Sequence, residues 1–363
     1  MTEELSRTSA LADRHIALGS GLEDWNGMGT AWSYDSNPND EHDAVRERAG
    51  MFDMSPLKKV FVRGQDAQAT LNHLTTRDIS KIAPGQSAYL CVLTDDGTIA
   101  DDAIVSNNGS NEWLIVHGSG DTMALLQASS KGKDVALQFT DDLHNISVQG
   151  PLALNTLNAY CDVDLELLKY FHHTPATLFG KACRISRTGY SGERGYEIFA
   201  EASVIVDLWD SLEEVGVMPC SFTSLDKVRI EAGLLFYGYD MTTHHTPWEV
   251  GLGFTINRDK SDFRGKTALL SARGQEKLRN VGLIIKHSDM VEGGETLSLD
   301  GQTVGTVNSP CYSHRLKQSL ALGHVDADIK VGTRLKLSSE NLETTATVAS
   351  LPFYDPEKSR THT

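Results

Sequence analysis

The chain has 363 residues, of which 23% are charged and 40% hydrophobic, the composition of a soluble globular protein with room for two or three domains. Its formal net charge of -16 argues against the basic face that nucleic-acid binding requires. No stretch reaches the ~18 apolar residues of a membrane span, and no apolar leader opens the chain, so we expect a cytoplasmic protein without membrane partners.

The cysteines and histidines form neither a disulfide pattern nor a metal pattern. The five cysteines lack C-x-x-C spacing and are scattered at Cys91, Cys161, Cys183, Cys220 and Cys311. The adjacent pairs His172-His173 and His244-His245 point their side chains apart, and no H-x-x-x-H occurs. We therefore expect reduced thiols and no metal site.

The first 160 residues alternate between short helical and extended patterns. Capping residues and apolar spacing predict helices at 11–18, 39–49, 66–74, 122–130 and 152–160, with Gly50 as the stop of the second. Alternating apolar residues predict strands at 59–62, 89–93, 98–105, 112–118, 135–139 and 146–148. Because this alternation lacks a regular parallel βαβ rhythm, it predicts α+β domains.

An aromatic-rich stretch, LEDWNGMGTAWSY, precedes the second of these helices. It carries Trp25, Trp32 and Tyr34 between glycines. Aromatic side chains bury large areas, so we expect a loop packed on the core, with the wall of a ligand pocket as the alternative.

Residues 89–105, YLCVLTDDGTIADDAIV, are the most informative stretch. An Asp-Gly pair between two apolar runs predicts a β-hairpin. With a two-residue loop, Cys91 would lie opposite Asp102, and Tyr89 would be diagonally adjacent on the same face. Asp101 and Asp102 point to opposite faces, and only one face can be wet if the other packs on a core. We therefore expect one carboxylate in largely apolar surroundings, as a candidate site.

The pattern changes in the second half of the chain. Strands are predicted at 182–186 and 196–200, on either side of the glycine-rich RTGYSGERG, and helices at 204–215 and 224–235. In the last helix, Asp226 and Arg229 are three residues apart and can meet on one face. From Arg279 onward, short alternating runs split by Gly and Asp predict an all-β, barrel-like domain. We expect an α+β region at 1–278 and the β-domain at 279–363.

An ordered series of motifs runs from about residue 41 to residue 360: EHDAVRERAGMFDMS, DDGTIADDAIV, QGP, RTGYSGERGYE, DKVRIEAGLLFYGYDM, TPWEVGLGFTI, DFRGKTAL and PFY. In this order they resemble the glycine-cleavage T-protein family, tetrahydrofolate-dependent aminomethyltransferases with related demethylases. The resemblance implies a trefoil of three domains around a central folate channel. Two of these are intertwined α+β domains, and the third is the C-terminal β-domain.

Matched motif by motif, the resemblance implies roles for individual residues. The second aspartate of I-x-D-D falls on Asp102, the family's catalytic carboxylate. Tyr170 and Phe171 align with two tyrosines that sandwich the folate, and Leu57 replaces a folate-lining methionine. The other implied cofactor contacts are Tyr89, Phe61, Tyr190, Glu197, Arg229, Tyr237 and Arg360.

The departures from the family pattern fall in segments that face the donor in the family's architecture. The chain reads DWNGMG where glycine-cleavage members read D-F-x-G-W-x-x-P, and MSPL where they read V-S-H-M, which replaces a histidine by Pro56. In addition, Trp25, Trp32 and Trp248 could cage a cationic methyl donor. We therefore expect transfer of a methyl group from a small N-, S- or O-methyl compound to N5 of tetrahydrofolate.

Two alternatives belong to the same superfamily. An aminomethyltransferase would take its carbon from a lipoyl carrier protein and give 5,10-methylene-tetrahydrofolate and ammonia. A non-catalytic folate-binding protein is the other alternative, but the K-G-C-Y-x-G-Q motif of those relatives is absent from this sequence.

Overall fold

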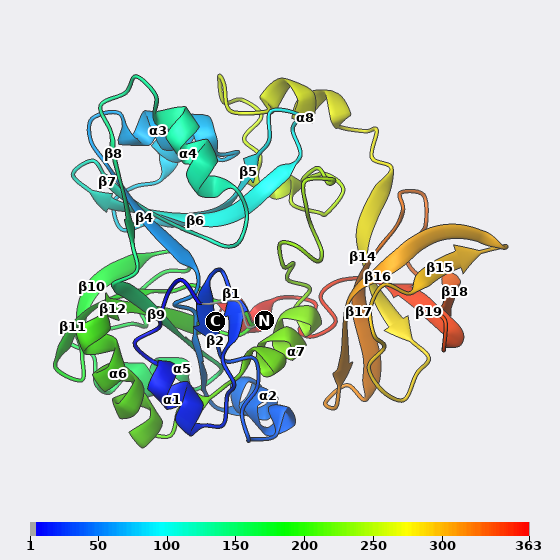
Figure 1. Ribbon diagram of the computed structural model, residues 1–363, viewed down its shortest axis with the longest axis horizontal. Coiled ribbons are helices and arrows are strands. Elements are labelled where there is room, and N and C mark those ends of the chain that lie inside the picture. Colours follow the sequence, from blue (N-terminus) through cyan, green and yellow to red (C-terminus); the bar gives the residue numbers. More distant parts are fainter. Residues whose placement is uncertain (1–4, 363) are drawn as a thin grey trace.

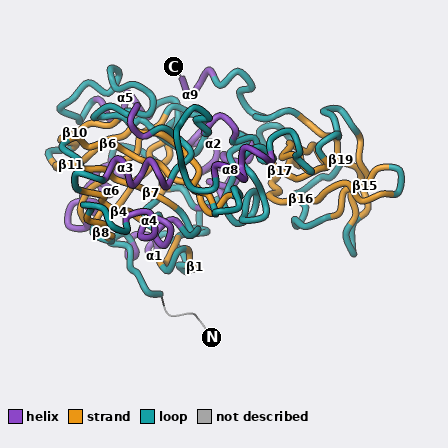
Figure 2. Tube along the Cα trace, turned by 90° about the horizontal axis from the view of Figure 1, so that it is seen from above, coloured by secondary structure: helices purple, strands orange, loops and turns teal. Residues whose placement is uncertain are grey.

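The computed structural model describes residues 5–362. Figure 1 shows two sheet-containing halves, one above the other, and a barrel beside them that is built from the C-terminal strands. Seen from above in Figure 2, the barrel forms one end of an elongated molecule. The first two parts therefore contact each other directly, while the barrel is attached from the side.

The upper half in Figure 1 contains the predicted hairpin. Within residues 5–362 its strand order is β5-β6-β7-β4-β8. Its strands and helices are β4 (Lys58–Arg63), β5 (Ser87–Leu93), β6 (Ile99–Gly109), β7 (Glu112–His117), β8 (Ala136–Thr140), α3 (Ala67–Leu74) and α4 (Thr122–Ser130). Alternate strand residues such as Val60, Leu90 and Val105 pack against Leu71 and Leu126 of the two helices, which gives this half its own core.

The lower half has the strand order β10-β11-β12-β9-β3-β13 within the described residues. Its elements are α1 (Ala12–Ala17), β3 (Gly50–Asp53), β9 (Leu143–Gln149), α5 (Ala153–Asn158), β10 (His173–Leu178), β11 (Lys181–Ser186), β12 (Gly195–Glu201), α6 (Ala202–Glu214) and β13 (Met218–Pro219). Trp209 of α6 is fully buried against Ile146 and Tyr196 of the sheet. The opposite faces of the two sheets meet through Val116 and Phe199. Because β3 precedes the first sheet in the chain and β9 follows it, the two halves are intertwined.

Two helices connect these halves to the barrel: α2 (Pro38–Glu47) and α7 (Phe222–Glu231). Glu231 of α7 is fully buried and accepts hydrogen bonds from His42 at 3.0 Å and Arg46 at 2.9 Å. Its other oxygen accepts from the hydroxyl of Ser313, a barrel residue, at 2.5 Å. Burial alone would raise the pKa of Glu231, but the hydrogen bond from His42 and the charge of Arg46 lower it to about 2. The junction between the helices and the barrel is therefore centred on a buried carboxylate whose charge is compensated by His42, Arg46 and Ser313.

The C-terminal strands close into a barrel in the order β14-β17-β16-β15-β18-β19 within the described residues. They are β14 (Leu278–Ile285), β15 (Thr296–Leu299), β16 (Gln302–Ser313), β17 (Gln318–Asp326), β18 (Arg334–Ser338) and β19 (Glu343–Ala349). Leu283, Leu297 and Leu335 fill its interior. The remaining elements are β1 (Glu23–Trp25), β2 (Met28–Thr30), α8 (Lys266–Ala272), α9 (Ser359–His362) and the 3-10 turns η1 (Ile79–Lys81) and η2 (Gly253–Thr255).

Most predicted elements are present, and the helix predicted at 122–130 has the same bounds in the structure. Gly50, however, does not stop a helix: it begins β3, where a Cβ would lie 2.6 Å from the sulfur of Cys220. The strand β10 and the helix α8 were not predicted. All five cysteines are free. Within residues 5–362, the helices are too short or too polar to span a membrane.

Candidate functional site

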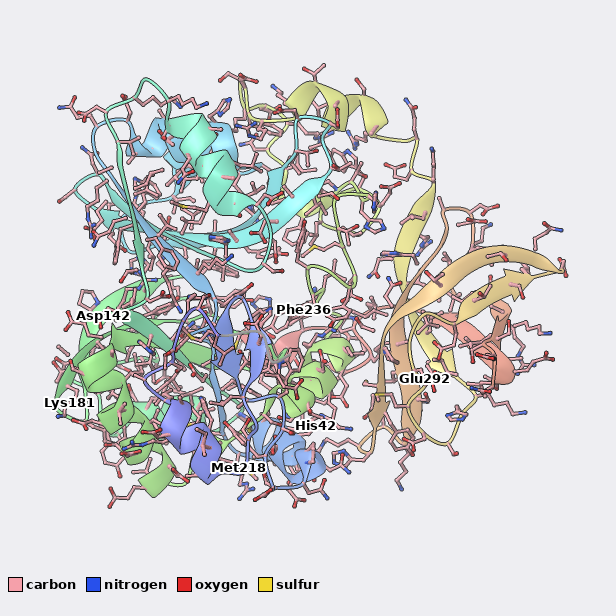
Figure 3. All side chains as sticks on the ribbon, viewed as in Figure 1. His42, Asp142, Lys181, Met218, Phe236 and Glu292 are labelled. Carbon is pink, nitrogen blue, oxygen red and sulfur yellow. The ribbon has the colours of Figure 1, made fainter. Side chains whose placement is uncertain are left out.

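A channel of about 840 Å³ lies where the two sheets meet. Tyr89 and Asp102 from the first sheet and Ser186 and Glu197 from the second form opposing parts of its wall. Loops at 188–193, 232–237 and 250–254 and the C-terminal segment complete the lining. Phe236, labelled in Figure 3, lies near the centre of the molecule, between the upper half and α7. This volume is within the range of roughly 300 to 1,000 Å³ that small-molecule sites occupy.

The predicted hairpin supplies four residues of this wall, Tyr89, Asp102, Ala103 and Ile104. Its register pairs Cys91 with Asp102, as expected from the sequence. The predicted two-residue loop is wrong, because Thr94 donates its backbone N–H to the carbonyl of Thr98 across residues 95–97. The expected register survives because a β-bulge next to the loop absorbs the extra residue.

This bulge also changes which neighbours share a face with Asp102. The register shifts between Val92 and Leu93, so Leu93 pairs with Ile99. Ile99 therefore packs in the cluster beside the channel, whereas Ala100 turns into the core of the upper half. The simple alternation had placed Ala100 on the face of Asp102.

Asp101 is fully buried on the opposite face. Its Oδ2 accepts from Nδ1 of His117 at 3.0 Å and from the hydroxyl of Thr122 at 2.7 Å, and its Oδ1 accepts from the backbone N–H of Asp102 at 2.9 Å. Asp101 is thus the carboxylate enclosed in the core, whereas Asp102, on the face expected to hold the candidate site, is only partly buried. Asp101 survives burial because three donors compensate it.

Asp102 is partly exposed in the channel and accepts a hydrogen bond from the hydroxyl of Tyr89 at 2.9 Å. Burial and the charge of Asp101 raise the pKa of Asp102 to about 7. The hydrogen bond from Tyr89 lowers this pKa and so partly offsets the rise. Burial and the charge of Asp102 also raise the pKa of Tyr89 well above 10, so its hydroxyl stays protonated and donates. A carboxyl group that titrates near neutrality is suited to general acid–base chemistry.

The second carboxylate in the channel wall is Glu197 of β12. Its two oxygens accept from the amide of Asn145 at 3.0 Å and from the hydroxyl of Thr188. Nearby, the hydroxyl of Tyr190 donates to the carbonyl of Leu235 at 2.5 Å. These bonds fix the orientation of a carboxylate that can accept N–H groups from a ligand.

The glycine-rich RTGYSGERG loop is folded around the side chain of Gln149. A Cβ on Gly189 or on Gly195 would lie 2.1 Å from the amide oxygen of Gln149. The same amide donates to the carbonyl of Thr188 and accepts from the hydroxyl of Ser191 at 2.7 Å. The two glycines are therefore required by this close approach, and the loop is held where it lines the channel.

Aromatic side chains form part of the channel wall. The rings of Tyr170 and Phe171 meet edge to face, with their centroids 4.7 Å apart. The ring of Tyr89 stacks on that of Phe254 at 6.4 Å. Phe171 adopts a φ of 57°, an unusual value for a bulky residue. Of the residues implied by the resemblance, the lining contains Leu57, Tyr89, Asp102, Tyr170, Phe171, Tyr190, Glu197 and Tyr237, and also Trp25.

Among the described residues, the channel lining does not include Phe61, Arg229, Arg360, Trp32 or Trp248. Arg229 is buried and bonds Asp226 at 2.8 Å and Asp240 at 2.6 Å, so the predicted pair with Asp226 is present. Trp25 and Trp32 both contact Phe222, whereas Trp248 packs in another cluster and donates to the carbonyl of Leu269. The three tryptophans therefore do not gather into one cage.

Several lining residues were not singled out from the sequence. Phe236 lies in a loop and Phe254 in the 3-10 turn η2, and neither segment has periodic hydrophobicity. The only available signal was an aromatic residue within three residues of a glycine, as in GLGF and GLLFYG. His117 and Thr122 could not be linked to Asp101 without knowing the strand pairing.

Comparison with known families now adds to this geometry. The model of the GCVT N-terminal domain matches residues 11–260, and the model of the glycine cleavage T-protein C-terminal barrel domain matches residues 279–355. The chain belongs to the glycine cleavage T-protein family. The resemblance noted in the motifs is thereby confirmed, as is the expected α+β architecture with a C-terminal barrel.

Within the T-protein family the chain has relatives of two kinds. It is 44% identical to the heme-dependent oxidative N-demethylase gamma subunit of Ectopseudomonas mendocina, over 98% of this chain and 97% of that protein. It is 35% identical to an aminomethyltransferase of Herpetosiphon aurantiacus, over 96% and 98% of the two chains. The crystal structure of the glycine cleavage system aminomethyltransferase T from Bartonella henselae superposes with a TM-score of 0.90 at 25% identity, covering 96% and 98%.

Proposed function

We propose that the protein is a tetrahydrofolate-dependent one-carbon transferase that moves a methyl group from a small N-methyl compound to N5 of tetrahydrofolate. The observation that carries this proposal is the pair formed by Asp102 and Tyr89 in the wall of a channel of ligand size. We also propose that the chain divides between residues 278 and 279 into a folate-binding region and a barrel domain.

The residues of the channel fit a folate. A folate carries a flat, nitrogen-rich ring system, which needs carboxylates for its N–H groups and aromatic faces for stacking. Glu197 of β12 is an oriented carboxylate within the wall, and Tyr190 lies in the loop that precedes this strand. Tyr170 and Phe171 offer aromatic faces in the same wall. We propose that these residues hold the cofactor.

When bound, tetrahydrofolate supplies the nucleophilic nitrogen that accepts the carbon. Asp102 would be the group placed to take up the proton of this nitrogen. Its Oδ2 is engaged by the hydroxyl of Tyr89, so we assign the proton to Oδ1. A pKa of about 7 makes Asp102 able both to accept this proton and to return it to the departing amine. The channel walls supply positioning and exclude water.

The proposal that the donor is an N-methyl compound rests on the similarity of this chain to proteins of known function. The N-demethylase gamma subunit is more similar to this chain than the aminomethyltransferases quoted above, at 44% against 35% identity. This favours carbon bonded to nitrogen over carbon bonded to sulfur or oxygen. Trp25, which lines the channel, is the single tryptophan of the expected three that can face such a donor.

A second candidate function is aminomethyl transfer from a lipoyl carrier protein, which would give 5,10-methylene-tetrahydrofolate and ammonia. It is favoured by the fold shared with aminomethyltransferase T at a TM-score of 0.90. The two functions differ in donor and in the oxidation level of the transferred carbon.

The product therefore decides between them. The protein would be incubated with tetrahydrofolate and, separately, with methylated amines, sulfonium compounds, methoxyaromatics and an aminomethylated lipoyl carrier protein. We expect 5-methyl-tetrahydrofolate with an amine donor. Formation of 5,10-methylene-tetrahydrofolate with the carrier protein alone would establish the second function instead.

A further inference from the structure

The two adjacent aspartates of β6 differ in the number of groups that hold them. Asp102 lines the channel and accepts from the hydroxyl of Tyr89 at 2.9 Å. Asp101 is fully buried and accepts from His117, from Thr122 and from the backbone N–H of Asp102. Each of these donors stabilises the ionised form of Asp101, so the two carboxyl groups compete unequally for a proton.

His117 reaches Asp101 because of the register between β6 and β7. This register pairs His117 with Ala103, which lies two residues beyond Asp101 on the same face of β6. The bond of 3.0 Å from Nδ1 to Oδ2 is therefore a diagonal contact across the ladder. Because an ionised carboxylate only accepts hydrogen bonds, Nδ1 carries the hydrogen.

The second ring nitrogen of His117 has no such bond. Its Nε2 is buried, and within residues 5–362 no group forms a hydrogen bond with it. A buried polar atom without a partner costs free energy, which a leucine of similar size would avoid. The benefit of a histidine at this position is therefore its bond to Asp101.

The segment that follows β7 packs closely over Asp101. Gly118 and Ser119 line the channel, whereas a Cβ on Gly120 would lie 2.1 Å from the carbonyl oxygen of Ala100 and 2.6 Å from the side chain of Asp101. A water molecule cannot take the place of a lost donor there unless this segment moves. The charge of Asp101 therefore depends on donors from the protein.

Other titratable side chains surround the two aspartates. They are Tyr89 and Cys91 of β5, Arg77 behind them, Lys58 of β4, Asp121 at the start of α4 and Tyr237 of the 232–237 loop. Burial raises the pKa of Cys91 and that of Tyr237 to about 12, and the pKa of Tyr89 well above 10, so these three groups stay protonated near neutral pH. The proton that is exchanged near neutral pH is therefore the one for which the aspartates compete.

We propose that His117 is a positioning residue that acts on Asp102 through Asp101. By holding Asp101 as a carboxylate, it directs the contested proton to Asp102, the aspartate that lines the channel. The inference rests on the proposed function, in which Asp102 exchanges this proton with the reactants. Without His117, Asp101 would hold the proton part of the time, and Asp102 would be ionised at a lower pH.

The kinetic test compares the pH dependence of kcat/KM in two variants. His117→Leu removes the donor, whereas the amide nitrogen of His117→Asn can replace Nδ1. With a pKa of about 7 for Asp102, the wild type should reach about one tenth of its plateau at pH 6. We expect this fraction to rise about threefold or more in His117→Leu and to stay at the wild-type value in His117→Asn. His287→Leu, two residues beyond β14 in the barrel, is the control.

A second measurement needs no folate and so separates this inference from the proposed function. Carbon-13 NMR of aspartate-labelled protein follows the carboxyl groups of Asp101 and Asp102, each assigned from its Asn variant. Between about pH 5 and pH 8 we expect Asp102 alone of the two to titrate in the wild type, and both to titrate in His117→Leu. Thr122→Val removes the other side-chain donor to the same oxygen of Asp101 and should act in the same direction, so it replaces His117→Leu if that variant does not fold.

The outcomes separate the two claims. An Asp101 carboxyl group that stays ionised throughout this range in the variants, with an unchanged fraction of activity at pH 6, would overturn the role of His117. The same loss of activity at every pH in His117→Leu would also overturn it, because a purely structural residue behaves in that way. Carboxyl titrations as expected, in a wild type that transfers no carbon to tetrahydrofolate, would overturn the proposed function and leave the placement of the proton by His117 standing.

Discussion

The hydroxyl of Tyr89 lies 2.9 Å from Oδ2 of Asp102, although Tyr89 pairs across the hairpin with Ile104 and Asp102 pairs with Cys91. The bond is therefore a diagonal contact on the channel face of the β5–β6 ladder. It ties the carboxyl group to a rigid strand neighbour. The first three predictions concern this pair.

Replacing Asp102 by Asn keeps the shape of the side chain and the acceptor for Tyr89 but removes the group that takes the proton. We expect Asp102→Asn to lower turnover by about two to four orders of magnitude, the usual range for loss of a general base. Folate affinity should change little. Steady-state kinetics and calorimetry measure the two effects, with the exposed Asp328→Asn as control. Near-wild-type turnover would falsify the role assigned to Asp102.

Removing the hydroxyl of Tyr89 should shift the pH profile. Activity that requires the carboxylate form of Asp102 rises as the pH increases through about 7. In Tyr89→Phe, the lost hydrogen bond no longer stabilises that form, so the midpoint of kcat/KM should move up by about one pH unit, or ~1.4 kcal/mol. Tyr160→Phe, just beyond the C-cap of α5, should leave the midpoint in place. A downward shift in Tyr89→Phe contradicts the arrangement.

Asp102 should also cost the protein stability at alkaline pH. Its pKa is raised from an ordinary value of 3.8 to about 7. Between these values the folded state holds a proton that the unfolded state has released, so this contribution to stability is lost as the pH rises from about 4 to about 7. Because Asp102 is partly exposed, we expect Asp102→Asn to be more stable than the wild type by only about 1–3 kcal/mol at pH 8, and by little at pH 4. Urea denaturation at both pH values measures this, and an equal effect at both rejects the explanation.

Asp101 should behave in the opposite way to its neighbour. Its carboxylate accepts from His117, from Thr122 and from a backbone N–H inside the core. We expect Asp101→Asn to lower the free energy of unfolding by about 2–4 kcal/mol, because the amide cannot accept all of these bonds. Denaturation midpoints of the two adjacent variants, measured at pH 8, should therefore move in opposite directions.

Arg229 should matter for stability more than for direct cofactor contact. Its guanidinium bonds Asp226 and Asp240 and donates to the hydroxyl of Ser309 on the barrel at 3.0 Å. We expect Arg229→Gln to cost about 3–5 kcal/mol, as is typical when one partner of a buried ion pair is removed. Arg334→Gln, at an exposed position on β18, is the control. A variant of normal stability with much weaker folate binding would instead assign Arg229 to the cofactor.

The hairpin shows most clearly which features could be predicted from the sequence and which could not. The face shared by Tyr89 and Asp102 follows from strand alternation and an Asp-Gly turn, both of which are local. The longer loop and the bulge change the register in opposite directions, so the expected pairing of Asp102 is correct although its stated reason is not. The partners of Asp101 lie on β7 and α4, and no local pattern reveals such contacts.

Local sequence patterns also could not reveal the contacts of the glycine-rich loop or all the partners of Arg229. Gly189 and Gly195 are spaced regularly in the sequence, but the reason for them is a glutamine 40 residues or more upstream. Arg229 could be paired with Asp226 from helical spacing, whereas Asp240 lies beyond the helix. The family motifs identified these residues in the sequence, but only the three-dimensional structure shows which residues they contact.

The buried contact among Glu231, Arg46 and Ser313 makes the C-terminal barrel a poor candidate for modular exchange. A barrel from a distant relative could supply an apolar surface of the right size and still leave one oxygen of Glu231 without a donor. The mismatch would cost about 1–3 kcal/mol or more for the unsatisfied charged group. Recombination at the boundary near residue 278 should therefore succeed only when β16 of the incoming barrel carries a hydrogen-bond donor at the position of Ser313.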